Sequence, residues 1–147
     1  MKVYADSSFV ASLYLPDLHS ARAIAWATDF KEPVLISALV ILELTNAAHL
    51  KVFRRQSEHV EASKSLEAFH KDLANGIWVA PQWPPRAWEE ADLISRSHTS
   101  SLGTRSLDIL HVAAAQVLKA ESFLTFNERQ AHLARTVGLA TPVQALQ

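Results

Sequence analysis

The fold is decided by the stretch VYADSSFVASLYL, residues 3–15. It begins as a short β-rich run, turns at Asp6, and continues with a helical pattern that Pro16 stops. The same alternation of β-rich runs and helical patterns recurs along the chain, with further β-rich runs at residues 34–36, 77–80, 122–126 and 139–143. This alternation predicts an α/β fold with a mainly parallel sheet of about five strands.

The composition excludes several classes of function. The chain has 147 residues without an internal repeat or a linker, so we expect one domain over residues 1–147. It has no cysteine, which excludes thiol nucleophiles, zinc fingers and disulfide frameworks. Its three glycines cannot form a dinucleotide-binding turn or a P-loop. The net charge of −1 argues against nucleic-acid binding through a broad basic face.

Membrane insertion and export are not expected. The longest apolar runs are far shorter than the ~20 residues that a membrane helix requires. The apolar N-terminus is interrupted by Asp6 and lacks a cleavage pattern for export. We therefore expect a cytoplasmic protein that has no contact with a membrane.

Two polar residues follow strands of the predicted sheet. Asp6 comes after the first strand, and Asn127 comes after the fourth. In open parallel sheets, ligands bind outside the carboxyl ends of the strands, so both positions are candidates for a functional site. The alternative for Asp6 is an N-cap that satisfies the first amides of the following helix.

Two more acids lie on the apolar faces of predicted helices. Glu43 shares a helical face with Ala47 and Leu50. Asp108 is likewise in line with Val112. A carboxylate on an apolar face is costly unless a cation or hydrogen-bond donors meet it. The alternatives are a buried salt bridge for Glu43 and, for Asp108, an acid that favours the positive end of its helix.

These three carboxylates and one carboxamide can meet in one pocket, where their mutual repulsion demands a cation. Oxygen ligands without cysteine favour Mg²⁺ or Mn²⁺ over zinc, and such a site suits phosphodiester hydrolysis. Other acid-based α/β chemistries fit less well. A phosphatase of the haloacid-dehalogenase type needs an aspartate where the chain has Ser8, and a receiver domain needs one where it has Pro81. The G-x-S-x-G elbow of hydrolases is absent.

The order of these motifs resembles the PIN-domain nucleases and, among them, the VapC-type toxins of toxin–antitoxin pairs. The succession of D-S-S, E-L-T, R-S-L-D-I-L-H-V-A-A-A and F-L-T-F-x-x-R-Q is specific. The matching segments extend over essentially the whole chain: VYADSSFVASLYL at 3–15, ISALVILELTNAAHL at 36–50, LGTRSLDILHVAAAQVLKAESFLTFNERQAHLA at 102–134, and GL at 138–139.

The resemblance implies a PIN-like three-layer α/β/α sandwich with strand order 3-2-1-4-5, which places Asp6 next to Asn127. It also implies that Asp6, Glu43 and Asp108 are the core metal-binding and catalytic acids of an endoribonuclease that cleaves single-stranded RNA with Mg²⁺ or Mn²⁺. The implied partners are an RNA substrate, a cognate antitoxin that inserts a peptide toward the acidic pocket, and a second copy of the chain in a homodimer.

Asn127 is the departure from the family, because many relatives carry a fourth aspartate there. Asparagine keeps an oxygen ligand and loses a charge, so we include Asn127 among the catalytic and metal-binding residues and expect weaker recruitment of a second metal. A catalytically weak or inactive PIN-like module that binds RNA or protein is therefore the alternative function. Glu128 and Asp92 are possible substitutes, although a helix-start acid and a solvated acid are the simpler interpretations.

Three more residues lie beside the predicted ligands in the sequence. Ser7 and Thr125 are expected to orient the carboxylates from a second layer. A capping serine and a strand threonine are the alternatives. Arg105, three residues before Asp108, is a candidate RNA contact through a phosphate group. A structural salt bridge is the alternative for Arg105.

Overall fold

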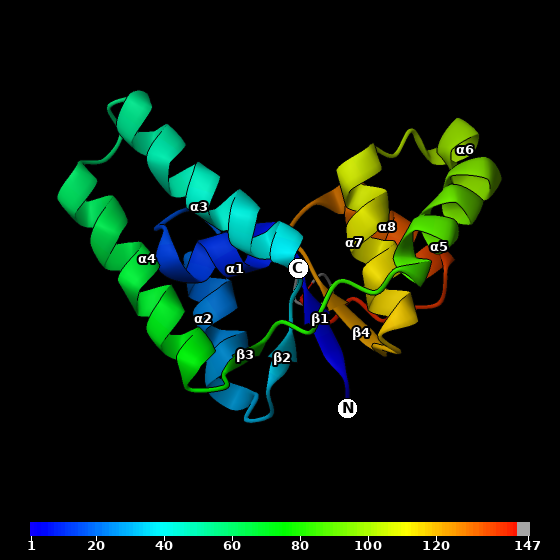
Figure 1. Cartoon of the computed structure of the whole chain (residues 1–147), viewed down its shortest axis with the longest axis horizontal. Helices are drawn as coiled ribbons and strands as arrows, with labels where there is room; N and C mark the ends of the chain where they lie inside the picture. Colours follow the sequence, from blue (N-terminus) through cyan, green and yellow to red (C-terminus); the bar gives the residue numbers. More distant parts are fainter. Residues whose placement is uncertain (144–147) are drawn as a thin grey trace.

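The centre of the fold is a parallel sheet, as predicted. A computed structural model describes residues 1–143 of the chain (Figure 1). Its four strands have the order β3-β2-β1-β4. They are β1 (Val3–Ala5), β2 (Val34–Leu35), β3 (Trp78–Val79) and β4 (Ser122–Leu124). The predicted α/β class and the strand order 3-2-1-4 are confirmed.

The fifth predicted strand, over residues 139–143, is reduced to a single parallel bridge between Ser122 and Ala140. The amide of Phe123 donates to the Ala140 carbonyl at 2.8 Å, so the segment lies beside β4, where the fifth strand was expected. Pro142 has no amide hydrogen to donate, and the ladder therefore does not continue.

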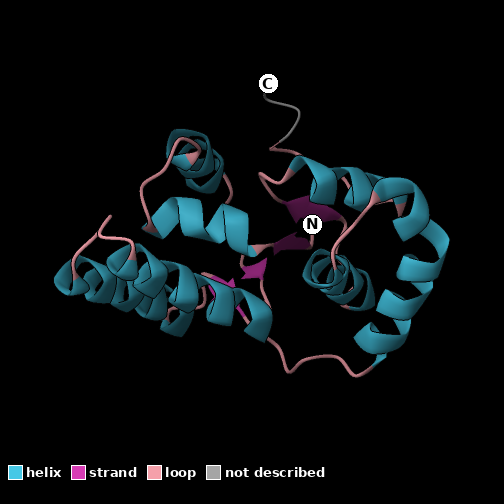
Figure 2. Cartoon of the chain, turned by 90° about the horizontal axis from the view of Figure 1, so that it is seen from above, coloured by secondary structure: helices cyan, strands magenta, loops and turns pink. Residues whose placement is uncertain are grey.

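Helices lie on both sides of the sheet (Figure 2). In chain order they are α1 (Ser7–Tyr14), α2 (Ser20–Asp29), α3 (Ala38–Phe53), α4 (His59–Ala74), α5 (Arg86–Ile94), α6 (Ser100–Leu102), α7 (Ser106–Val117) and α8 (Glu128–Thr136), with a π-helical segment (Ser95–Thr99) between α5 and α6. Helices α1 to α4 pack on one another, and α7 packs on α5 and α8. Within residues 1–143, no helix has the length and apolar character that crossing a membrane requires.

The first strand and its helix fix the position of Asp6. Residues 3–5 are fully buried, and Asp6 is the N-cap of α1, because its Oδ1 accepts a hydrogen bond from the Phe9 amide at 3.1 Å. The Phe9 ring stacks on the Phe126 ring, with centroids 5.7 Å apart. This contact joins the start of α1 to the segment after β4 and closes the edge of the sheet where both strands end.

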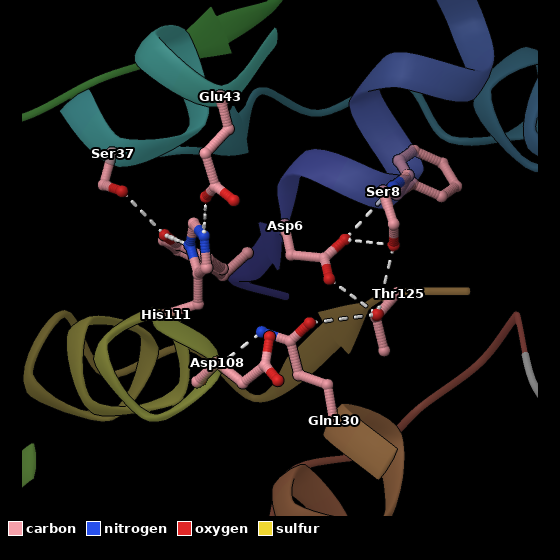
Figure 3. Close-up of polar contacts among 10 residues, drawn as sticks. Asp6, Ser8, Ser37, Glu43, Asp108, His111, Thr125 and Gln130 are labelled. Carbon is pink, nitrogen blue, oxygen red and sulfur yellow. Dashed lines mark hydrogen bonds and ion pairs between the residues drawn. The ribbon is translucent and has the colours of Figure 1, made fainter. Parts of the chain in front are cut away.

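Gly103 turns the chain from α6 toward α7. Its φ of 64° is left-handed, a conformation that residues with a Cβ disfavour. Three residues later α7 begins, and its first turn carries Asp108. The turn therefore delivers the second predicted helix acid to the same end of the sheet as Asp6 (Figure 3).

Candidate metal centre

The carboxyl ends of β1 and β4 lie side by side. Ala5 is in register with Leu124, and the Asp6 amide donates to the Leu124 carbonyl at 3.0 Å. Asp6 is therefore the neighbour of Thr125, and Asn127 lies two residues farther along. The two strands lie side by side, as expected. The residue next to Asp6 is Thr125 and not Asn127, because β4 ends at Leu124 rather than at Phe126.

Asp6 is buried in a shell of hydrogen-bond donors. Only 2% of the residue is exposed. Ser8 Oγ donates to its Oδ1 at 2.7 Å, and Thr125 Oγ1 donates to its Oδ2 at 2.6 Å (Figure 3). Burial raises the pKa of Asp6, and the nearby His111 side chain together with these hydrogen bonds acts in the opposite direction. The N-cap and the buried acid are thus the same side chain.

The serine that supports Asp6 is Ser8 and not Ser7. Ser8 Oγ also lies 3.2 Å from Thr125 Oγ1 and accepts from the Phe126 amide at 3.0 Å. Ser7, the first residue of α1, makes no side-chain hydrogen bond within residues 1–143. Thr125 thus contacts the Asp6 carboxylate, as its expected orienting role requires. The contact expected of Ser7 is made by Ser8.

Glu43 reaches the site from α3 and contacts a buried histidine. Its Oε1 is hydrogen-bonded to Nε2 of His111, which is 2% exposed, while 31% of the Glu43 side chain is exposed. The other ring nitrogen, Nδ1, lies 2.9 Å from the Tyr4 hydroxyl. Burial raises the pKa of Tyr4, so its phenol keeps its proton. The predicted alternative for Glu43, a buried salt bridge, left its partner unnamed, and the structure gives His111 as that partner.

Asp108 lies in the first turn of α7, one turn before His111. Burial raises the pKa of its carboxyl, and the charge of Glu43 raises it further. The nearby His111 and Arg105 side chains have the opposite effect on the same pKa. Gln130 Nε2 donates to the Asp108 backbone carbonyl at 3.3 Å, which fixes this turn against α8. Asp108 and Glu43 are thus close enough to repel each other.

Asn127 and Arg105 lie at the rim of the site. Asn127 is exposed, and its Oδ1 accepts from the Gln130 amide at 3.0 Å as the N-cap of α8. Arg105 is exposed at the residue before α7. Asp92 lies apart from this rim in an exposed ion pair with Arg96.

The donor set fits a hard divalent cation in its chemistry and charge. All candidate ligands are oxygens, and no lysine or arginine forms an ion pair with any of the three acids within residues 1–143. The raised pKa values of Asp6 and Asp108 show that ionisation is costly without a counter-charge. In that same part of the chain, no three acid or histidine side chains come close enough together to form a metal site.

Sequence reasoning did not single out three of the contacting residues. Tyr4 and Gln130 read as core and helix residues, and both are fully buried polar side chains in the structure. Ser8 was indistinguishable from Ser7. The one signal in the sequence was the spacing of Gln130 from Asn127. Gln130 comes three residues after the N-cap of α8, where its amide donates to the Asn127 side chain.

A second polar cluster lies in an aromatic cavity of about 310 Å³ between α1, α2 and α4. Its walls include Phe9, Trp26 and Trp78. Tyr14 donates to Asp72 Oδ2 at 2.5 Å and accepts from Trp78 Nε1 at 2.6 Å. In this cluster the Tyr14 hydroxyl has both a hydrogen-bond acceptor, the Asp72 carboxylate, and a donor, the Trp78 indole.

Comparisons with known proteins agree with this architecture. The family model for the PIN domain matches residues 3–136. No curated protein sequence matches the chain significantly.

Three solved structures are similar to the chain. VapC20 of Mycobacterium tuberculosis, described as a sarcin-ricin loop cleaving toxin, is 17% identical with a TM-score of 0.68, covering 89% of this chain and 94% of that one. FitAcB from Neisseria gonorrhoeae is 17% identical with a TM-score of 0.63 and covers 95% of both chains. PAE2754 from Pyrobaculum aerophilum is 18% identical with a TM-score of 0.62, covering 99% of this chain and 92% of that one. At these identities the likeness concerns the fold.

Proposed function

The chain belongs to the PIN-domain family, and from that premise we propose that it is a single-domain, divalent-metal-dependent endoribonuclease that cleaves single-stranded RNA as the toxin of a VapBC-type pair. The observation that carries the proposal is the set of three carboxylates, Asp6, Glu43 and Asp108. They come from the end of β1, from α3 and from α7 to one end of the sheet, and no lysine or arginine within residues 1–143 forms an ion pair with them.

Asp6, Glu43 and Asp108 would hold the cation. When bound, Mg²⁺ or Mn²⁺ supplies activation of water and neutralisation of charge on the phosphate. Ser8 and Thr125 keep the Asp6 carboxylate in one orientation through hydrogen bonds of 2.7 and 2.6 Å. A fixed ligand loses less conformational freedom on binding than a mobile one.

Asn127 and Arg105 take secondary roles in this proposal. Arg105 is exposed beside Asp108, where a guanidinium can pair with an RNA phosphate. Asn127 offers a carboxamide oxygen, but that oxygen already caps α8. We therefore expect Asn127 to be a weak outer ligand, and we expect a second metal to bind weakly.

An exposed apolar face beside the acids supports a protein partner. Leu42 is 65% exposed and Trp88 is 61% exposed, and with Leu39 and Leu110 they line a groove of about 210 Å³. We assign this face to a second copy of the chain, while the antitoxin peptide approaches the acids. Sedimentation velocity should show a dimer that Leu42→Glu dissociates; an unchanged dimer would place the interface elsewhere.

A catalytically weak PIN-like module is the second candidate. Asn127 favours it, and so do the hydrogen bonds that engage Asp6 and Glu43 in place of a converged ligand set. In this version the same end of the sheet binds RNA or protein without cleaving it.

Purified protein incubated with an RNA pool and Mg²⁺ or Mn²⁺ distinguishes the two. The native chain should cleave, and Asp6→Ala should not. Undiminished cleavage by Asp6→Ala would disprove the assigned site. Activity that appears only in Asn127→Asp would favour the attenuated module. A short upstream reading frame for a small DNA-binding protein would support the toxin assignment, and a toxin of this kind acts on RNA in the cytoplasm.

A further inference from the structure

A line of hydrogen bonds runs through the core to Glu43. Ser37 Oγ lies 2.8 Å from the Tyr4 hydroxyl, which lies 2.9 Å from Nδ1 of His111, and Nε2 of His111 is bonded to Glu43 Oε1. Figure 3 shows Ser37, His111 and Glu43 along this line, with the second oxygen of Glu43 turned away from the imidazole. The line connects three elements, β1, α3 and α7.

The chemistry of the groups fixes the direction of the protons. The Glu43 carboxylate only accepts hydrogen bonds, so Nε2 of His111 must carry the proton. A neutral imidazole then leaves Nδ1 as an acceptor, and the Tyr4 hydroxyl donates to it. The Tyr4 oxygen in turn accepts from the Ser37 hydroxyl. The one consistent arrangement with a neutral ring therefore runs from Ser37 to Tyr4, to His111 and to Glu43.

The Ser37 side chain joins this line of hydrogen bonds and does not cap α3. It occupies the N-cap position of α3, yet its side chain makes no capping hydrogen bond. A filled serine cap typically contributes about 1 kcal/mol. Its hydroxyl is instead buried against Tyr4. This loss is understandable if the hydrogen bond to Tyr4 serves something other than helix stability.

We propose that His111 is a positioning residue that holds Glu43 toward the metal, with its ring fixed as the Nε2–H tautomer by Tyr4 and Ser37. The proposal rests on the proposed function, because it takes Glu43 to be a metal ligand. A neutral donor orients one carboxylate oxygen and leaves the charge of Glu43 available, whereas a lysine or arginine at this place would compete with the cation. Outer partners of this kind set ligand orientation in metal sites.

The first test is the protonation of the His111 ring in the full-length protein. Nitrogen-15 NMR of the imidazole should find Nε2 protonated and Nδ1 unprotonated at neutral pH. Tyr4→Phe removes the donor to Nδ1 and keeps the ring that stacks on Phe123 at 5.6 Å. In this variant the ring should lose its single tautomer. An Nδ1–H tautomer or a doubly protonated ring in the native protein would overturn the proposal.

The second test is the affinity for Mn²⁺ alone, measured by calorimetry without RNA. Tyr4→Phe and His111→Leu should bind Mn²⁺ about 10- to 100-fold more weakly. His111→Gln, which keeps an N–H donor at similar volume, should recover part of the affinity. Tyr14→Phe is the matched control, since it removes another hydrogen-bonded tyrosine hydroxyl, one that contacts Asp72 and not Glu43, and should leave the affinity unchanged.

The results separate this proposal from the nuclease assignment. Unchanged Mn²⁺ affinity in folded Tyr4→Phe, with RNA cleavage intact, would remove the positioning role and leave the nuclease. The predicted tautomer and a weakened Tyr4→Phe, without any cleavage of RNA by the native chain, would retain the positioning role and remove the nuclease. Circular dichroism of each variant establishes that it is folded.

Discussion

The molecule contains two tyrosine clusters, one buried around Tyr4 and one half-buried around Tyr14, whose hydroxyls lead to acids with different surroundings. Around Tyr14, the hydroxyl donates to Asp72 and accepts from Trp78, and no further acid joins them among the cavity's polar contacts within residues 1–143. Around Tyr4, the hydrogen bonds lead through His111 to Glu43, and Asp6 and Asp108 lie nearby. The hydrogen bonds of the first cluster contain one acid, while those of the second lead to one acid that has two more acids nearby.

The number and burial of the acids distinguish a candidate functional cluster from a structural one better than the size of a cavity does. The Tyr14 cluster lines a cavity of about 310 Å³ whose walls are mainly aromatic and apolar, which suits packing. Near the Tyr4 cluster, burial raises the pKa values of the Asp6 and Asp108 carboxyls. Shielded acids at the end of a parallel sheet therefore mark the candidate site.

The largest expected difference between the two regions is in the rate of RNA cleavage when an aspartate in each is replaced by asparagine. Asp6→Asn should lower the rate of RNA cleavage by at least about a thousandfold, because a metal ligand contributes several kcal/mol to transition-state stabilisation. Asparagine keeps the N-cap of α1, so the fold should persist. Asp72→Asn should cleave at the native rate. Initial rates with a fluorescent RNA measure both, and similar losses in the two variants would contradict the distinction.

The next effect is the dependence of stability on pH and metal. Because the folded-state pKa values of Asp6 and Asp108 are raised, the folded chain binds their protons more tightly than the unfolded chain. Their contribution is fully present below about pH 4 and is lost as the pH rises through the folded values. Mn²⁺ should offset this loss at neutral pH, by about 2.7 kcal/mol at a hundred times Kd, and have little effect in acid.

Thermal unfolding with and without Mn²⁺, from about pH 4 to about pH 8, measures this dependence. The Asp6→Asn, Asp108→Asn double variant is the control, and it should show a smaller response to both pH and Mn²⁺. Stabilisation by Mn²⁺ that is equal at both ends of the range would show binding elsewhere.

A smaller effect is expected from the Tyr14 cluster. Tyr14→Phe leaves Asp72 and Trp78 without their shared partner and should lower the free energy of unfolding by about 1–2 kcal/mol. Urea denaturation measures the loss. RNA cleavage should stay at the native level, and a fall in cleavage that exceeds the fall in folded fraction would connect the two clusters.

The smallest change in stability is expected at the rim. Asn127→Asp should alter the free energy of unfolding by less than about 0.5 kcal/mol, because asparagine and aspartate cap helices equally well. The added charge should strengthen Mn²⁺ binding several-fold, as seen by calorimetry. Unchanged binding would mean that Asn127 lies too far out to affect the cation.

Much of the site follows from the sequence because strand ends and helix faces have local signatures. Asp6 follows a buried run, and Glu43 and Asp108 interrupt apolar faces, so all three acids can be selected as candidates from the sequence. The residue opposite Asp6 is not predictable, because β4 stops at Leu124 when the Phe126 amide turns to donate to Ser8. That contact joins residues distant in the chain and leaves no periodic pattern.

Pairings between helices were also beyond sequence reasoning. Glu43 and His111 are 68 residues apart, and nothing in the sequence pairs the one with the other. The choice between Ser7 and Ser8 depends on the rotation of α1, which the Asp6 cap sets. The predicted fifth strand is too long, because the prediction followed its apolar residues and gave too little weight to Pro142.

The uncapped start of α3 has a dynamic consequence. Helices α1 and α8 begin with side-chain caps from Asp6 and Asn127, whereas Ser37 gives α3 none. Amide hydrogens in the first turn of α3 should therefore exchange with solvent faster than those at the other two starts. Each local opening of this turn loosens Ser37 from Tyr4. A cation held by Glu43 should slow this exchange, so that occupancy of the metal site can be detected in the first turn of α3, which precedes Glu43 in the same helix.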